Sequence, residues 1–264
     1  LFGSLPRPSR KLHPTYTVEP VQDGERGATV RRVGDVQVVG VAYHGVAAAD
    51  PEFAAAEAAV DVLTHEATGR VYRALVETKQ ATGLKAEATR TAEPGTVEVL
   101  LDVPKAQPIE PVRDRLLTII EGLGRGPIED AELRRFKSSA RKNFRRISAQ
   151  PQLLAADLAA WVAVGDWRLR YLHRDRVQAL TPDAVAAFAR RFLLSSNRSV
   201  GLFLPTADPQ RSPLPAPPQL AQALQGYKGQ APPVPGEAFA ANFDNIEARV
   251  VRSTLNIGMK LALL

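Results

Sequence analysis

The chain has 264 residues, of which 45% are hydrophobic and 23% charged, values typical of a globular protein with a substantial core. It contains no cysteine, which excludes disulfides, thiolate metal sites and cysteine nucleophiles. No apolar run approaches the roughly 20 residues that a membrane-spanning helix needs. The net charge of +6 is a modest excess, and we interpret it as a solvated surface rather than a site for acidic partners.

Two β-like runs and a helix open the folded part of the chain. The first run covers residues 28–32, with Val30 expected to face inward, and the second, rich in valine, covers residues 36–44. A helix is expected over residues 51–65, because Asp50 is a suitable N-cap and proline follows it in the first turn. This helix is rich in alanine, so we expect it to pack closely on a sheet.

The stretch 69–104 predicts a helix followed by a β-hairpin. Apolar residues recur at helical spacing, and Gly83 is expected to end the helix because glycine readily adopts a positive φ. Extended runs at 84–92 and 96–104 follow, separated by the turn-forming segment 93–95. In the second run, alternate residues are apolar, which is typical of a half-buried strand.

The remaining elements are four helices and a closing strand. Helices are expected over 109–123, from residue 130, from Pro151 to about residue 164, and from Thr181, and a strand over 199–204. The resulting order, β-β-α-α-β-β-α-α-α-α-β, pairs the strands and groups the helices. This order predicts an α+β fold, an antiparallel sheet covered by helices, rather than a doubly wound fold.

The composition divides the chain into four segments. Residues 1–27 read as an extended lead-in, and 28–204 as the α+β domain. Residues 205–247 form a linker that carries nine prolines between positions 205 and 235, and 248–264 read as the beginning of a further domain. Because the chain starts with leucine and stops inside an apolar run, we expect it to be a piece of a longer protein.

Three segments carry a family resemblance. The lead-in reads LFGSLPRP…YTVEP…GER, the central helix and hairpin read small-Arg-apolar-x-x-x-Leu and then Gly-Leu, and the last residues read EARVVRSTLNIGMKLALL. In this order they resemble the non-catalytic second domain, the connector and the next opening strands of bacterial pitrilysin/insulysin-type (M16) zinc metallopeptidases. The resemblance implies the fold of the mitochondrial-processing-peptidase/LuxS-like metallohydrolase domains.

The family's chemistry depends on an inverted zinc motif, H-x-x-E-H, in which two His bind the metal and the Glu activates its water. None of the four histidines of this chain lies in such a motif. They are His13, His44, His65 and His173. We therefore expect no metal ligand and no catalytic residue here, and zinc only in the full-length parent. The substrate-binding residues stay unknown. The family's oxyanion-stabilising Arg and Tyr correspond by resemblance to Val76 and Ala86, and neither side chain can donate a hydrogen bond.

By resemblance, the chain has a structural role in a zinc-dependent endopeptidase that cleaves peptides or unfolded polypeptides. It would wall the substrate chamber, with its own N-terminal catalytic domain, the C-terminal half of the protein and a peptide substrate as partners. Neither nucleic acid nor membrane is expected as a partner. The alternative is a degenerate parent that works as a non-catalytic scaffold or binding subunit. The resemblance places the parent in the periplasm or outside the cell, with the cytoplasm as the alternative.

Three features have competing interpretations. Seven basic residues on the helix from 130 could follow phosphates, but we interpret them as a solvated face. Trp161, Trp167 and Tyr171 could line a groove, and we interpret them as core or interdomain packing. The three glycines near the end of the 109–123 helix lack the pattern of a phosphate loop and are treated as a helix stop.

Overall fold

The structure is a computed structural model that describes residues 20–230, 233–234, 236 and 238–264. The proposed lead-in therefore lies largely outside the described residues. The chain forms two compact units that divide between Arg211 and Ser212, and each is described by itself. Among the described residues, no helix combines the length and apolar character needed to cross a membrane.

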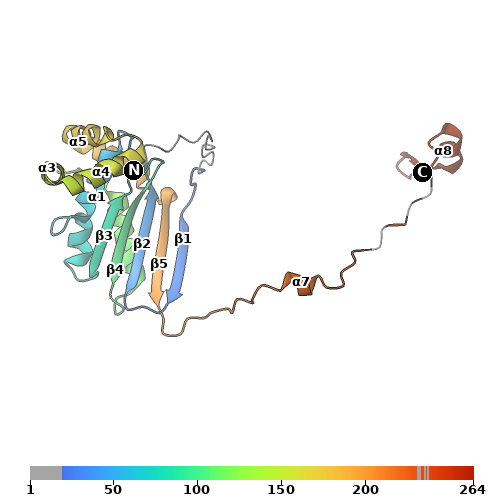
Figure 1. The fold of residues 1–264 in the computed structure, drawn as a ribbon, viewed down its shortest axis with the longest axis horizontal. Coiled ribbons are helices and arrows are strands. Elements are labelled where there is room, and N and C mark those ends of the chain that lie inside the picture. Colours follow the sequence, from blue (N-terminus) through green and yellow to red (C-terminus); the bar gives the residue numbers. More distant parts are fainter. Residues whose placement is uncertain (1–19, 231–232, 235, 237) are drawn as a thin grey trace, which may run out of the picture. The chain divides into compact units, whose positions relative to one another are not determined.

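The first unit is built on a five-stranded sheet (Figure 1). Its strands are β1 (Arg26–Arg32), β2 (Gln37–His44), β3 (Gly83–Ala88), β4 (Thr96–Val103) and β5 (Arg198–Pro205). They lie in the order β1-β5-β2-β4-β3. All neighbours are antiparallel except β1 and β5, which run parallel. β5, the last of these five strands in the sequence, thus lies between β1 and β2, the first two.

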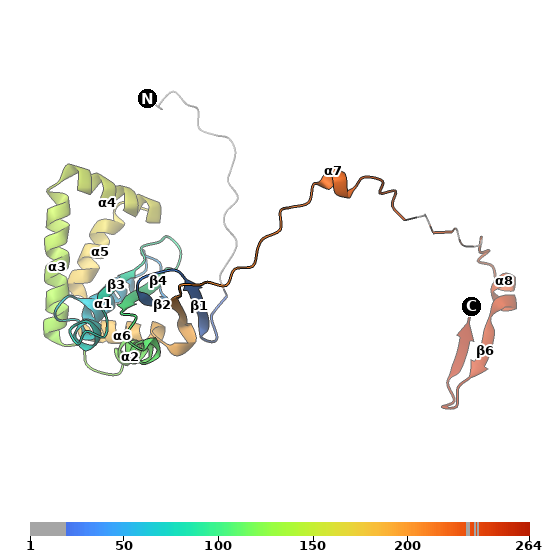
Figure 2. The ribbon, with the colours of Figure 1, turned by 90° about the horizontal axis from the view of Figure 1, so that it is seen from below.

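One face of the sheet forms the main core. Alternate residues of β2 and β4 are buried, including Val41 and Leu101, because successive side chains of a strand point to opposite faces. The helices α1 (Phe53–Thr64), α2 (Ile109–Gly122) and α6 (Pro182–Phe192) contribute the opposing apolar residues. Figure 2 shows α2 and α6 on the same side of the sheet. The expected α+β fold with a largely antiparallel sheet is confirmed.

Three further helices, α3 (Asp130–Ser148), α4 (Pro151–Val164) and α5 (Leu169–Ala179), form a group at one end of the unit. Pro151 occupies the first turn of α4, where its missing N–H costs nothing, and α3 and α4 meet there at a sharp corner (Figure 2). A small second core, which includes Phe53 of α1 and Trp161 of α4, joins this group to the rest of the unit.

The structure corrects two local expectations. Gly83 does not end a helix: it is the first residue of β3, next to Asp102. The preceding helix is a short π-helix, Tyr72–Val76, and the positive φ, 61°, belongs to Lys79. The expectation that Val30 faces inward is also wrong, since the residue is 46% exposed. It lies on β1, an edge strand on which no residue is buried.

A third correction concerns the number of helices between β4 and β5. The sequence predicts four, whereas the described residues contain five, because α5 was not expected. The buried residues of α5 are Arg170 and Val177. A buried arginine interrupts the apolar repeat from which an amphipathic helix is recognised.

The second unit holds four short elements among its described residues. These are α7 (Leu220–Ala223), α8 (Phe243–Arg249), β6 (Val251–Thr254) and β7 (Lys260–Leu263). The last two pair as an antiparallel hairpin, with Gly258 in the turn at a φ of 81°. None of these four elements contains a buried residue.

Candidate functional site

On the face of the sheet opposite the main core, the described residues leave the strands largely uncovered, and we call this face the open face. β2 alternates large buried residues with Gly40 and Ala42, which point to this open face. The register places Gly201 of β5 beside Gly40, and Ala28 of β1 beside Gly201. Leu100 of β4 lies on the other side of Gly40 and is 45% exposed. A row of mostly small side chains therefore crosses the sheet.

This row forms a trough. A hollow of about 420 Å³ lies over β1, β5, β2 and β4, and another of about 210 Å³ lies over β4 and β3. The two share Glu98 and Leu100. Larger residues would fill the trough, because a Cβ added at Gly40 would come within 3.1 Å of the Leu100 Cδ2 atom.

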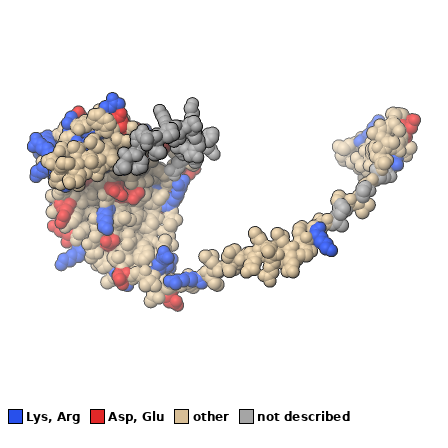
Figure 3. All heavy atoms as spheres, viewed as in Figure 1, with Lys and Arg blue, Asp and Glu red and all other residues tan. Residues whose placement is uncertain are grey.

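Charge is unevenly distributed over the open face. Lys85, Glu87 and Glu98 line the hollow at the β3 side. Figure 3 shows this face, with charged groups over β3 and β4 and mainly uncharged surface over its centre. Helix α4 stands on the same side of the sheet, at one end of the strands (Figures 1 and 2). The trough thus has a helical border at that end.

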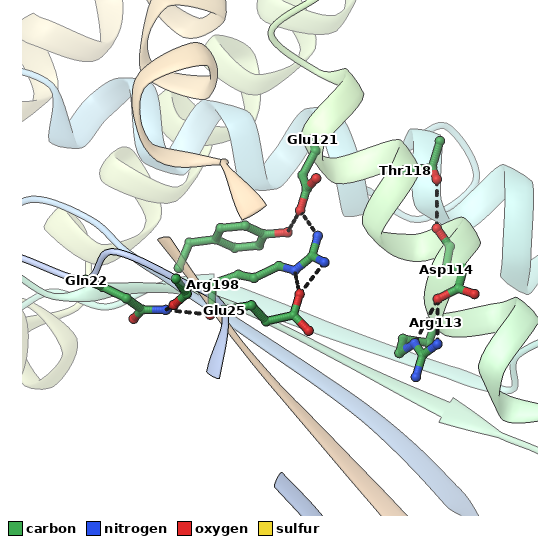
Figure 4. Close-up of polar contacts among 9 residues, drawn as sticks. Gln22, Glu25, Arg113, Asp114, Thr118, Glu121 and Arg198 are labelled. Atoms are coloured by element: carbon green, nitrogen blue, oxygen red, sulfur yellow. Dashed lines mark hydrogen bonds and ion pairs between the residues drawn. The ribbon is translucent and has the colours of Figure 1, made fainter. Parts of the chain in front are cut away.

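A polar network fastens the sheet to α2. Arg198, the first residue of β5, forms ion pairs with Glu121 of α2 and with Glu25, next to β1 (Figure 4). The Tyr43 hydroxyl donates to the same Glu121 carboxylate over 3.2 Å. Burial, and secondly the negative charge of Glu121, raise the pKa of the Tyr43 hydroxyl, so it stays protonated as a donor. Gln22 also donates to the Arg198 carbonyl over 2.6 Å. This network ties the start of β5 and the end of β2 to α2.

The histidines are dispersed, and one lies outside the described residues. His44 ends β2, and His65 follows α1, where its Nδ1 atom bonds to neighbouring backbone and to Thr68. His173 of α5 pairs with Glu57 of α1. In the described part of the chain, no cluster of three or more His, Cys, Asp or Glu could hold a metal. These residues do not fit a zinc site, and no step of a zinc reaction is assigned to them.

Val76 and Ala86, matched from the sequence by resemblance to the family's oxyanion-stabilising Arg and Tyr, both pack partly buried against the main core. Val76 ends the π-helix and Ala86 lies on β3. The absence of functional residues here stays a prediction. The residues of the open face were missed from the sequence, although the small residues alternating with valines in β2 were an available signal.

The three features with competing interpretations are placed as follows. Several basic residues of α3 have internal partners: Arg135 pairs with Asp61, and Lys137 donates to the Gln178 carbonyl. Trp161 is buried, whereas Trp167 is 49% exposed and packs edge-on against Tyr171. Of the three glycines near the end of α2, Gly124 packs closely against Arg190 of α6, whereas a Cβ added at Gly122 or Gly126 would have no neighbour within 4 Å.

The geometry defines a class of protein: an α+β domain whose main core lies between one face of its sheet and α1, α2 and α6, with no metal-ligand cluster among its described residues. The family model for the peptidase M16 inactive domain matches residues 1–140. The chain is 33% identical to the inactive peptidase domain of a proposed zinc protease from Bordetella parapertussis, covering 70% of this chain and 99% of that one, with a TM-score of 0.63. This chain belongs to the family of M16 peptidase inactive domains.

Other comparisons agree on the fold. A proposed zinc protease from Bordetella pertussis is 30% identical, with 64% of this chain and 94% of that one covered and a TM-score of 0.60. A protease from Helicobacter pylori has the same fold at 20% identity, with a TM-score of 0.72 over 77% of this chain and 50% of its own length. No curated protein matches the chain.

Proposed function

We propose that the chain is the non-catalytic domain of a zinc-dependent metallopeptidase and that its open sheet face forms part of the wall around the peptide substrate. The observation that carries this proposal is the trough across the open face, opposite the helix-covered core. A sheet with one bare face of small residues has room for another chain to lie against it. Zinc belongs to the catalytic domain of the parent in this proposal.

The same geometry supports the proposed partners. At the β3 edge of the trough, β3 pairs with β4, and within the described residues no strand lies beside its other edge. An extended peptide, the parent's own catalytic domain and the C-terminal half of the parent are the proposed occupants of this side. The alternative function is a scaffold subunit that binds a peptide without cleaving it.

The domain limits are part of the proposal: a lead-in over 1–27, the domain itself over 28–204, a linker over 205–247 and the start of the next domain over 248–264. The linker would limit how far the two halves of the parent separate. The periplasmic location expected from the family resemblance is proposed for the parent as well.

The first experiment compares the full-length parent with the 264-residue chain. We expect the parent to bind zinc stoichiometrically and to cleave a long unstructured peptide, and the 264-residue chain to do neither. Metal content and peptide hydrolysis are measured on both proteins. Hydrolysis by the 264-residue chain alone would overturn the proposal. A parent that binds the peptide but does not cleave it with zinc present would favour the scaffold alternative.

A pair of substitutions tests the trough in the parent. Ala28 lines the trough, and the neighbouring Thr29 points to the opposite face of the same strand. We expect Ala28→Tyr to lower kcat/KM for a long peptide about tenfold, which corresponds to ~1.4 kcal/mol of lost transition-state binding. Thr29→Tyr is the matched control and should leave kcat/KM unchanged. If both substitutions lowered kcat/KM equally, the trough would not be a wall of the substrate site.

A further inference from the structure

A cavity of about 150 Å³ lies among α3, α4 and α5, away from the trough residues. Its lining is rich in charged and aromatic side chains rather than aliphatic ones, and it includes Arg90, Phe144, Asp157, Trp161, Arg170 and His173. The proposed wall function makes no use of this cavity. Its walls come from separate parts of the chain, since Arg90 follows β3 and the other five residues lie on α3, α4 and α5.

The lining has an excess of positive charge. Four guanidinium groups line the cavity, those of Arg90, Arg141, Arg170 and Arg174, against the two carboxylates of Glu57 and Asp157 and a third, Asp175, that pairs with Arg174 outside the lining. Asp157 accepts from both Arg170 (2.7 Å) and Arg90 (3.3 Å), so a single carboxylate serves two cations. An anionic ligand would reduce the electrostatic repulsion among these groups.

Arg170 is the fixed cation of the site. Its side chain is 2% exposed, and its guanidinium donates to Asp157 and, over 3.0 Å, to the Ser148 hydroxyl. The same guanidinium lies 3.9 Å from the centroid of the Phe144 ring. A buried arginine held by a carboxylate, a hydroxyl and an aromatic face has little freedom left, which is a property of preorganised anion sites.

The aromatic wall contains a histidine, His173, with one ring nitrogen that forms no hydrogen bond within the described residues. The His173 ring lies between Phe53 and Trp161, with ring centroids 5.5 and 5.4 Å away, and its Nε2 atom is 2.8 Å from the Glu57 carboxylate. Its Nδ1 atom is buried and has no hydrogen-bond partner in the described part of the chain. A buried polar atom without a partner is costly. Because Nε2 donates to the Glu57 carboxylate, Nδ1 of the neutral ring is an acceptor, and a water or another O–H or N–H group in the cavity would satisfy it.

The cationic side has unused donors as well. Arg141 donates one N–H group to the Gln178 side chain over 2.7 Å, and Arg90 donates one to Asp157. A guanidinium has five N–H donors in a planar fork suited to a carboxylate. The bonds found among the described residues therefore leave both groups able to receive an anion.

We propose that this cavity binds a carboxylate attached to a small apolar group. The guanidinium groups receive the carboxylate, and Phe144 and Trp161 contact the apolar part. The volume of the cavity limits the size of the ligand. A cavity of about 150 Å³ in another protein, lined by apolar residues, holds a molecule as large as benzene. A free small carboxylic acid and the C-terminal residue of a peptide share this chemistry, whereas the middle of a peptide does not.

The two tryptophans make a direct measurement possible. Trp161 lines the cavity, and the exposed Trp167 is the other tryptophan of the chain. The 264-residue chain with Trp167→Phe retains Trp161 as its reporter. We expect benzoate to change its fluorescence saturably, with a dissociation constant on the order of 1 mM, as for other ligands of this size. Benzamide, which has the same shape without the charge, should give no saturable change.

Charge-neutral substitutions test the assignment of the site. Arg141→Gln removes an exposed cation of the lining, and we expect it to weaken benzoate binding at least about fivefold. Arg134→Gln removes a cation of the same helix that does not line the cavity, and it should leave the affinity unchanged. Circular dichroism of both variants establishes that they fold. Equal binding of benzoate and benzamide, equal effects of the two substitutions, or no saturable signal would overturn the proposal.

A final comparison separates the two sources of the ligand. The tripeptide Gly-Gly-Phe is measured with a free and with an amidated C-terminus. Binding of the free form alone, lost with Arg141→Gln, identifies peptide C-termini as ligands. Benzoate binding without tripeptide binding identifies a free small acid. Both results support the site, and neither depends on whether the parent cleaves peptides, so failure of the wall proposal would leave this one standing.

Discussion

A single carboxylate can tie together parts of the first unit that are far apart in the sequence, and Glu132 is the clearest case. It lies in the first turn of α3, where its carboxylate accepts from the Glu129 backbone N–H over 2.9 Å. The same carboxylate accepts two bonds from Arg70, at 2.8 and 3.0 Å. Partial burial opposes ionisation, but the bonds from Arg70 and from the Glu129 backbone outweigh it and lower the pKa of Glu132.

Glu132→Gln should therefore destabilise the chain in a pH-dependent way. A lowered folded-state pKa means that the stabilisation is fully present above the ordinary value of 4.5 and is lost as the pH falls through the folded-state pKa. At pH 7 we expect the free energy of unfolding to fall by about 1 kcal/mol, the usual value of a helix cap. Urea denaturation from pH 7 to pH 3 should show the two proteins converging in acid.

The control for this substitution is Glu110→Gln. Glu110 also lies in the first turn of a helix, α2, but it is exposed. It should change the free energy of unfolding by no more than a few tenths of a kcal/mol at any pH. A difference between wild type and Glu132→Gln that stayed constant down to pH 3 would show that charge is not the cause.

At the scale of elements, the sequence predicts most strands and helices because their apolar repeats are regular. It fails where a polar residue takes a core position or an unusual residue takes a turn. Arg170 replaces an apolar residue in the buried face of α5, so that helix was missed. Lys79 adopts the positive φ that the sequence assigns to Gly83, and the missing side chain of Gly83 instead leaves room for Asp102 on the neighbouring strand.

The contact between the end of α2 and α6 depends on Gly124. A Cβ at this position would come within 2.7 Å of the Arg190 backbone nitrogen, and backbone cannot move aside as a flexible side chain can. Gly124→Ala should therefore lower the free energy of unfolding by about 1–3 kcal/mol, the usual cost of overpacking. Thermal or urea unfolding of the 264-residue chain measures this change.

The matched control lies two residues earlier in the same segment. A Cβ at Gly122 would meet nothing within 4 Å, and Gly122 is the last residue of α2. Gly122→Ala should be neutral or slightly stabilising, because alanine has the higher helix propensity. If both substitutions destabilised equally, backbone conformation rather than the α2–α6 contact would be the reason for the glycines.

The candidate sites show what a sequence without structure cannot supply. The trough joins Ala28, Gly40 and Gly201, and the further cavity joins Arg90 with Arg170. These groups come together only through the insertion of β5 between β1 and β2 and the return of α5 alongside α3. Strand order and helix return are set by the packing of the whole unit, whereas the periodic pattern of each segment reports only its own buried face.

At the scale of the whole molecule, stability is concentrated in the first unit. Both core clusters consist of residues no later than Val200, and the elements of the second unit contain no buried residue. Its largest paired element is the β6–β7 hairpin. An isolated two-stranded hairpin is at best marginally stable in water, because it has no apolar layer to pack on.

Hydrogen exchange on the 264-residue chain tests this difference. We expect the amides of β2 and β4 to exchange only by global unfolding, since both strands are paired on two sides. The amides of β6 and β7 should exchange close to the unprotected rate. Equal protection of β6 and β4 would show that the hairpin is stable without further strands. Under the proposed function, the same β6 and β7 amides should become protected in the full-length parent, where the next domain would supply those strands.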